Sequence, residues 1–309
     1  MTATTGPAPA TAGARTSASP TKTRRKRRLT PGSVFAHSIM VLGLLYFFTP
    51  LLWLMLAATK TNGGLFNSFG FWLAQPFNLF QNISDVFSRD NGVYVLWLRN
   101  TAIYACTSAV LSTLIAAFAG YAFAVYEFRG RNVIFAIVIG SVFVPASVLA
   151  VPLFFMMSKI GLSNTLVAII LPALVNPFGV YLMRIYADKA VPRELIDAAR
   201  IDGAGELRIF GQVAFRLLAP GFVTVLLLSF VGAWNNYFLP LLILSKSDTF
   251  PVTVGLAYWN SLATQPGNVQ VLYAIVVTAS LLAIVPVMIA FLVVQRYWEG
   301  GLTVGGVKE

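Results

Sequence analysis

Charged residues are scarce in this chain of 309 residues. Asp, Glu, Lys and Arg together make up 11% of it, against about a quarter of an average soluble domain. Hydrophobic residues make up 57%. So few charges cannot cover the surface of a water-soluble domain, and the composition therefore predicts a membrane protein.

Side chains that bind metals or act as acids, bases and nucleophiles are also few. The chain has one cysteine, Cys106, and one histidine, His37, and both lie in apolar runs. No disulfide can form within the chain, and no C-x-x-C metal motif occurs. No acid–base or nucleophile pair is visible. We therefore expect no metal site, no cofactor and no catalytic residue.

The net charge of +11 is concentrated rather than spread over a surface. A basic block, KTRRKRR (22–28), comes directly before the first apolar run, and the aromatic residues lie inside apolar runs. This distribution excludes nucleic acid as a partner. Apart from this basic block, residues 1–32 are mostly small or polar residues that cannot form an apolar core. We therefore predict a disordered basic tail over residues 1–32.

Six apolar stretches are long enough to cross a bilayer, which takes about 20 residues. They cover residues 33–59, 101–126, 133–157, 164–186, 217–244 and 271–295. The first stretch is longer than the apolar part of a signal peptide, so we interpret it as an uncleaved helix. The sequence thus predicts an all-α, polytopic membrane protein with six transmembrane helices.

The distribution of Lys and Arg predicts the orientation. An even number of spans places both termini on the same side of the membrane. With the termini in the cytoplasm, 17 of the 22 Lys and Arg residues lie on the cytoplasmic side, as the positive-inside rule requires. We therefore predict cytoplasmic termini, an extracytoplasmic loop over 60–96, cytoplasmic loops over 127–132 and 187–216 and a cytoplasmic tail over 296–309.

A charged segment, RELIDAARIDGAGELRIFGQ (193–212), interrupts the apolar pattern within a predicted cytoplasmic loop (187–216). Arg193, Asp197 and Arg200 fall on one side of a helix, so Asp197 can pair with both arginines. Gly203 then loosens the helix. The pattern alone fits a short helix that docks on a soluble partner. It fits a solvated loop or an interfacial helix equally well.

The fifth apolar stretch contains FVGAWNNYFLP, which places asparagines at membrane depth. Ser229, Gly232 and Asn236 form a small, polar stripe on one side of a helix. Intramembrane polar groups often mark substrate paths, although such a stripe also suits packing between helices. Together with Trp234 and Tyr237, this composition predicts a pathway for an uncharged, polyhydroxylated solute.

The sequence lacks two features through which transporters use energy: a charged residue in the middle of a span and a nucleotide-binding loop. No Asp, Glu, Lys or Arg lies in the middle of any predicted span, which argues against a proton-coupled secondary carrier and an ion-selective pore. No phosphate-binding loop of the form G-x-x-x-x-G-K-[ST] occurs. Any ATP hydrolysis must therefore take place on another protein, and the chain itself is not expected to be an enzyme.

Several segments resemble one known family. DAARIDGA (197–204) resembles the EAA motif of the membrane subunits of binding-protein-dependent ABC importers. The segments at 217–244, 248–257 and 293–309 are similar to sugar-importing permeases of the maltose type, and the likeness covers about residues 99–309. Two departures occur: Asp197 replaces the first Glu of the motif, and Phe215-Arg216 stands where the family usually has Leu-Pro.

The resemblance implies a type I ABC importer transmembrane domain over residues 97–295. It implies that the charged segment is a coupling helix that contacts the ATPase through Glu194, Asp197, Ala198, Ala199, Asp202 and Gly203. The expected partners are a homologous second permease, a cytoplasmic ATPase dimer, an extracytoplasmic solute-binding protein, a sugar and membrane lipid. The expected location is the bacterial cell membrane. Importers of glycerol phosphoesters or polyamines are the alternatives within this class.

Overall fold

The computed structural model describes residues 2, 6, 31–265 and 272–302, and the regular structure within them is entirely helical. The chain divides into two compact units, residues 1–49 and 50–309. The described part of the first unit is mainly the start of helix α1 (Pro31–Ala58). Nearly all of the predicted disordered tail lies outside the described residues, as do residues 303–309 of the predicted C-terminal tail.

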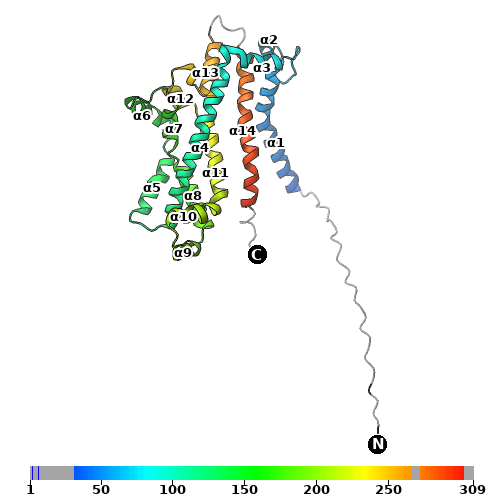
Figure 1. Ribbon diagram of the computed structural model, residues 1–309. Coiled ribbons are helices and arrows are strands. Elements are labelled where there is room, and N and C mark those ends of the chain that lie inside the picture. Colours follow the sequence, from blue (N-terminus) through cyan, green and yellow to red (C-terminus); the bar gives the residue numbers. More distant parts are fainter. Residues whose placement is uncertain (1, 3–5, 7–30, 266–271, 303–309) are drawn as a thin grey trace. The chain divides into compact units, whose positions relative to one another are not determined.

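Beyond α1, the second unit is built from helices α2 to α14, which Figure 1 labels in chain order. The longer helices are α3 (Leu79–Ser88), α4 (Val93–Val125), α5 (Arg131–Val142), α6 (Ala146–Lys159), α8 (Pro177–Ala190), α9 (Arg193–Ile201), α11 (Phe215–Trp234), α13 (Val252–Ala263) and α14 (Leu272–Leu302). The shorter ones are α2 (Asn62–Asn67), α7 (Val167–Ala173), α10 (Glu206–Ile209) and α12 (Phe238–Ile243), with a π-helical turn at Phe210–Ala214.

The number of membrane spans agrees with the sequence. Four continuous helical stretches of the described chain are long and apolar enough to cross a membrane. Two bent pairs, α5–α6 and α7–α8, raise the number to six if each pair is one span. α14 continues beyond the predicted end of the last span and reaches Leu302.

Each of the predicted spans over 133–157, 164–186 and 217–244 is broken into two helices. The α5–α6 pair bends by 100° and the α7–α8 pair by 40°. Pro145 precedes α6 and Pro177 begins α8, where their missing N–H groups and their restriction of the preceding residue end the helix before them. α11 ends at Trp234, and α12 begins only at Phe238.

α4 is the central helix of the second unit and contacts α8 and α11 most extensively. Its buried face is rich in alanine, serine and glycine, which lets neighbouring helices approach closely. At Gly120 a Cβ atom would lie 2.6 Å from the Cβ of Met183 on α8. Any larger residue there would push the two helices apart.

The two ends of this bundle differ in their covering. At one end, α2, α3 and α13 surround the start of α4, and we call this the α13 end (Figure 1). Trp97 of α4 and Trp259 of α13 pack there with ring centroids 4.6 Å apart. α9 and α10 lie at the opposite end, which we call the α9 end. Both loops that the sequence predicts to be cytoplasmic, 127–132 and 187–216, meet at this α9 end.

Candidate functional site

The charged segment forms a short helix with a defined start and end. Glu194 lies in the first turn of α9 and Arg200 in the last, so both charges complement the helix dipole. Gly203 has a φ of +76°, which favours glycine. The N–H of Gly203 donates to the carbonyl of Arg200, and the N–H of Ala204 donates to that of Ala199. This pair of bonds is the Schellman arrangement, which reverses the chain sharply after α9.

Arg200 lies at the centre of the charge network of this loop. Its Nε lies 2.9 Å from Glu206 Oε1, and its Nη1 lies 3.2 Å from Asp197 Oδ1. The hydrogen bond to Glu206 raises the pKa of Arg200 above its usual value, so the guanidinium stays charged. Arg193 was also predicted to pair with Asp197. It pairs instead with Glu127 in the loop that follows α4, with 3.5 Å between Arg193 Nη1 and Glu127 Oε1.

An apolar strip and a hydrogen bond from Tyr126 help to attach the loop to the bundle. Ile196 and Ile209 are buried in a cluster that includes Tyr121 of α4. The ring of Phe210 also packs on Tyr121, with centroids 5.2 Å apart. The hydroxyl of Tyr126, just after α4, donates to Glu206 Oε2. A displacement of α9 and α10 would therefore act directly on the end of the central helix.

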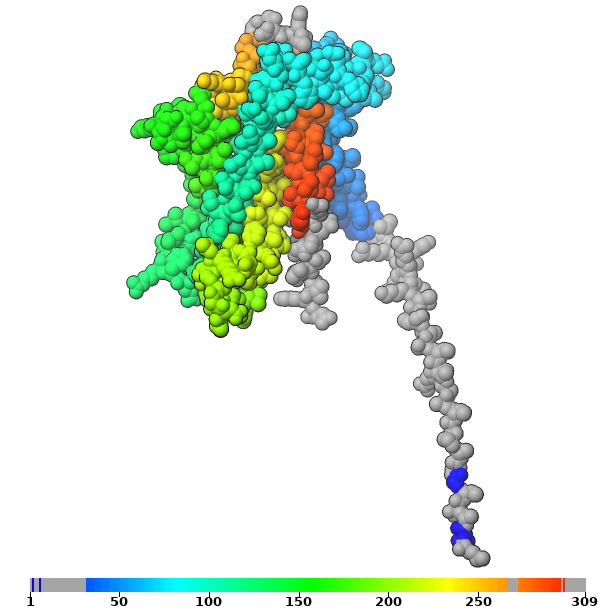
Figure 2. All heavy atoms as spheres, viewed as in Figure 1, coloured from blue at the N-terminus to red at the C-terminus, as the bar shows by residue number. Residues whose placement is uncertain are grey.

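The outer face of the loop combines charge with exposed apolar side chains. Ile201 is 87% exposed and Leu207 81% exposed, and Leu195 is also exposed. Figure 2 shows this region, in yellow-green, as the projecting tip of the α9 end. Such apolar groups on a projecting surface are typical of a contact with another protein.

The residues that the sequence predicts for ATPase coupling lie on this projecting loop. Five of them are exposed: Glu194, Asp197, Ala198, Asp202 and Gly203. Ala199 is half-buried and packs against the cluster that attaches the loop to the bundle. The exposed members are thus free of contacts with the rest of the bundle that would prevent a partner from reaching them.

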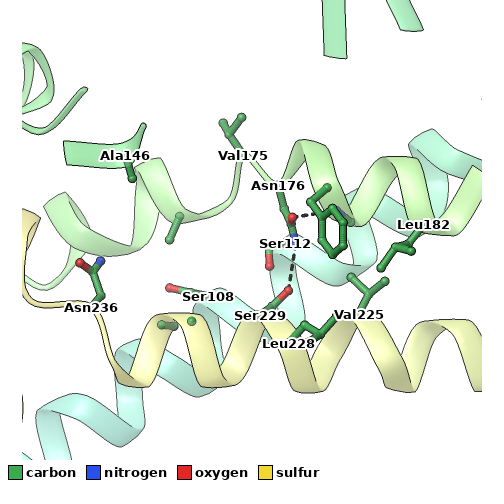
Figure 3. Close-up of a pocket in the computed structure, with 15 residues that line it drawn as sticks. Ser108, Ser112, Ala146, Val175, Asn176, Leu182, Val225, Leu228, Ser229 and Asn236 are labelled. Carbon is green, nitrogen blue, oxygen red and sulfur yellow. Dashed lines mark hydrogen bonds between the residues drawn. The ribbon is translucent and has the colours of Figure 1, made fainter. Parts of the chain in front are cut away.

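A half-open cavity of about 390 Å³ lies between α4, α8 and α11. Its polar lining residues are Ser108, Ser112, Asn176, Ser229 and Asn236, and its other lining residues are apolar or glycine. No charged side chain lines it among the described residues. The cavity therefore offers neutral hydrogen-bonding groups but no general acid, base or fixed ionic charge (Figure 3).

Asn176 joins two walls of this cavity. Its Oδ1 accepts a hydrogen bond from the N–H of Gly179 at 2.8 Å and thereby caps α8. Its Nδ2 donates to the Oγ of Ser229 on α11 at 2.9 Å. Figure 3 shows this bridge beside the hydroxyl groups of α4. The break between α7 and α8 thus places an amide in the cavity and fixes it against α11.

The residues that the sequence predicts for a pathway separate into two groups. Ser229, Gly232 and Asn236 line the cavity. Trp234 is buried and packs on Phe230, and Tyr237 is partly exposed after the end of α11, so neither lines the cavity.

Sequence reasoning missed three polar lining residues, Ser108, Ser112 and Asn176. Asn176-Pro177 carries a signal, because asparagine before proline is typical of a helix start. The two serines are four residues apart in an apolar run and therefore share one helix face. Only the packing of α4 against α8 and α11 shows that this face lines a cavity.

Known proteins with similar sequences are membrane components of transport systems. Residues 112–300 match the family described as binding-protein-dependent transport system inner membrane component. The arabinooligosaccharides transport system permease protein AraQ of Halalkalibacterium halodurans is 39% identical over 84% of this chain and 90% of its own. The lactose transport system permease protein LacG of Rhizobium radiobacter is 29% identical over 93% and 99%.

One solved structure has a similar fold. The crystal structure of a bacterial ABC transporter involved in the import of the acidic polysaccharide alginate contains a chain that matches with a TM-score of 0.76. The match covers 91% of this chain and 100% of that one, at 22% sequence identity. The bent helix pairs and the projecting loop therefore belong to a fold already seen in a transporter.

Proposed function

Because the chain belongs to the family of binding-protein-dependent transport system inner membrane components, we propose that it is a permease subunit of an ABC importer for uncharged carbohydrates. The observation that carries this proposal is the neutral, hydroxyl- and amide-lined cavity inside the helical bundle. Sugars present many hydroxyl groups and no charge, and such a lining can donate to them and accept from them.

The names of the relatives favour a sugar over the other solutes. AraQ and LacG are named for arabinooligosaccharides and lactose. A polyamine or a glycerol phosphoester carries charge, and no charged side chain lines the cavity in the described chain, which suits an uncharged solute better. Ser229, Gly232 and Asn236 form one wall of the pathway in this proposal.

The projecting loop couples the permease to a separate ATPase. Glu194, Asp197 and Asp202 present negative charge beside the exposed Ile201, a combination that suits docking into a groove of a soluble subunit. Closure of the ATPase would push α9, and the attachment through Tyr121 and Tyr126 would pass the movement to α4. Solute then moves by alternating access.

The remaining partners follow from this assignment. A homologous second permease forms the other half of the pathway, an ATPase dimer binds at the α9 end, and a solute-binding protein delivers the sugar at the α13 end. This arrangement requires a cytoplasmic α9 end. The ion pair between Arg193 and Glu127 supports it, because it joins the two loops that the positive-inside rule assigns to the cytoplasm.

A secondary carrier is the alternative from another class of transporter. Such a carrier would work without an ATPase and commonly uses a titratable side chain within the membrane. The cavity has no such side chain among the residues that the structure describes. The projecting apolar residues of the loop would also have no use in a carrier that acts alone.

Reconstitution tests the proposal directly. The chain is co-expressed with its second permease and ATPase, incorporated into vesicles, and supplied with the binding protein and labelled arabinotriose or lactose. We expect uptake that requires internal ATP and survives a protonophore. Uptake that persists without the ATPase but stops with the protonophore would identify a secondary carrier instead.

A further inference from the structure

Ser108 of α4 has an unusual environment for a serine in a membrane helix. Its side chain is 2% exposed, and its Oγ has no hydrogen-bond partner in the described chain. A helical serine away from water often donates to a carbonyl one turn earlier, as the half-buried Ser280 of α14 does to the carbonyl of Val276 at 2.7 Å. Ser108 forgoes this bond, so its hydroxyl retains both its donor and its acceptor capacity.

The hydroxyl of Ser108 lies beside the cavity. Ser108 lines the cavity, and Figure 3 draws its oxygen toward the open space between Asn236 and Ser229. Ser112 lines the same wall one turn along, and its Oγ lies 3.4 Å from the carbonyl of Ala109, a long and weak bond. Two hydroxyl groups of α4 therefore face the amides and the hydroxyl of the opposite walls.

The chain offers an internal comparison. Thr113 and Thr278 are also buried without a hydrogen-bond partner, but neither lines the cavity. Only at Ser108 does an unpaired buried hydroxyl coincide with space for a ligand in the described residues. Leaving such a group unpaired is unfavourable, and a ligand that bonds to it recovers the loss.

We propose that Ser108, assisted by Ser112, forms a hydrogen-bonding subsite for the hydroxyl groups of one sugar ring during its passage. This inference rests on the proposed function and adds a substrate-contacting wall on α4. A serine hydroxyl both donates and accepts, as a sugar hydroxyl does, so the two are mutually complementary. The cavity is at the low end of the range of about 300–1,000 Å³ for small-molecule sites, which suits one ring rather than a long chain.

The test measures uptake of arabinotriose and of lactose by the reconstituted complex with Ser108→Ala, Ser112→Ala or the matched control Ser280→Ala. We expect Ser108→Ala to lower the rate of sugar uptake about 3- to 10-fold, as loss of one hydrogen bond implies. We expect a smaller decrease with Ser112→Ala and none with Ser280→Ala. ATP turnover and the amount of assembled complex should stay within about twofold of wild type, so the sugar carried per ATP falls.

Each other outcome overturns the inference in a distinct way. Equal uptake with Ser108→Ala and Ser280→Ala would mean that the hydroxyl contacts only water. A parallel decrease in uptake, ATP turnover and assembled complex would assign Ser108 a structural role. If the wild-type complex transports neither sugar, the proposed function itself fails and this inference fails with it, whereas normal wild-type uptake limits the failure to the subsite.

Discussion

The α13 end and the α9 end of the bundle differ in the polar contacts that stabilise them. At the α13 end, neutral aromatic side chains are buried and bond to backbone carbonyls: Trp97 Nε1 donates to Ser247 and Tyr94 to Ala279, both at 2.7 Å. At the α9 end, the loop packs on the bundle through an apolar strip, and exposed ion pairs centred on Arg200 join its own segments.

This difference shows how each end is held within the chain. At the α13 end, Asn100 donates to the carbonyl of Asp248 and Thr101 accepts from the N–H of Val252, so the segment before α13 is fixed within the chain. The loop at the α9 end leaves Ile201 and Leu207 in solvent. Burying such side chains stabilises a complex, and the loop therefore gains stability when a partner covers it.

The largest expected effect is a difference in thiol labelling between the two ends, because they lie on opposite sides of the membrane in our proposal. In a Cys106→Ala background, a cysteine that replaces the exposed Ser261 of α13 should react with an impermeant thiol reagent added outside intact cells. A cysteine that replaces Glu206 should react only after the cells are opened. Asn82 also belongs to the predicted outer loop, but it is buried, so the reagent would not reach a cysteine at this position. Labelling at position 206 in intact cells would contradict the proposed orientation.

The next largest effect concerns the turn after α9. Gly203→Pro should abolish ATP-driven uptake while the protein still inserts, because proline cannot adopt the φ of +76° found there. Gly205→Ala is the matched control in the same turn, since Gly205 has a φ of −70° and a Cβ there meets open space. Uptake assays with equal amounts of complex check this. Normal uptake with Gly203→Pro would remove the loop from coupling.

A third prediction concerns the stability of the α13 end. Trp97→Ala should lower the free energy of unfolding by about 3–5 kcal/mol, because a large and fully buried ring leaves a cavity. Trp72→Ala should change it by less than about 1 kcal/mol, since the side chain of Trp72 is exposed. Denaturant unfolding of the purified complex compares the two variants. Similar losses would show that the packing of α13 on α4 contributes little.

The smallest expected effect concerns the ion pairs of the α9 end. Glu206→Gln weakens the pair with Arg200, and exposed pairs contribute only about 0–1 kcal/mol to stability. We expect a change within that range, and we expect it to disappear at high salt because surface charges are then screened. A loss above about 2 kcal/mol would show that this loop is as self-sufficient as the α13 end.

Composition and apolar length predicted the membrane class, the number of spans and the position of the charged loop. These features depend on residues that are close together in the sequence. The breaks at Pro145 and Pro177 were harder to predict, because proline is common inside membrane helices and does not always end them. Pro50 and Pro286, for example, lie inside α1 and α14.

Pairings between distant segments could not be predicted from the sequence. Helical spacing assigned Arg193 to Asp197, but its observed partner, Glu127, lies 66 residues away. Asn176 and Ser229 are 53 residues apart and meet only because α8 and α11 pack together. One wall of the cavity was therefore visible in the sequence, while the walls on α4 and α8 required the structure.

The most direct test of the account is the amount of ATPase that co-purifies with the chain. Asp197→Lys reverses an exposed charge on α9, and like charges brought together at an interface disfavour binding by several kcal/mol, so retained ATPase should fall at least about tenfold. Asp248→Lys makes the same change on an exposed residue at the α13 end and should retain the wild-type amount. Wild-type retention with Asp197→Lys, or equal losses with both variants, would contradict docking through α9.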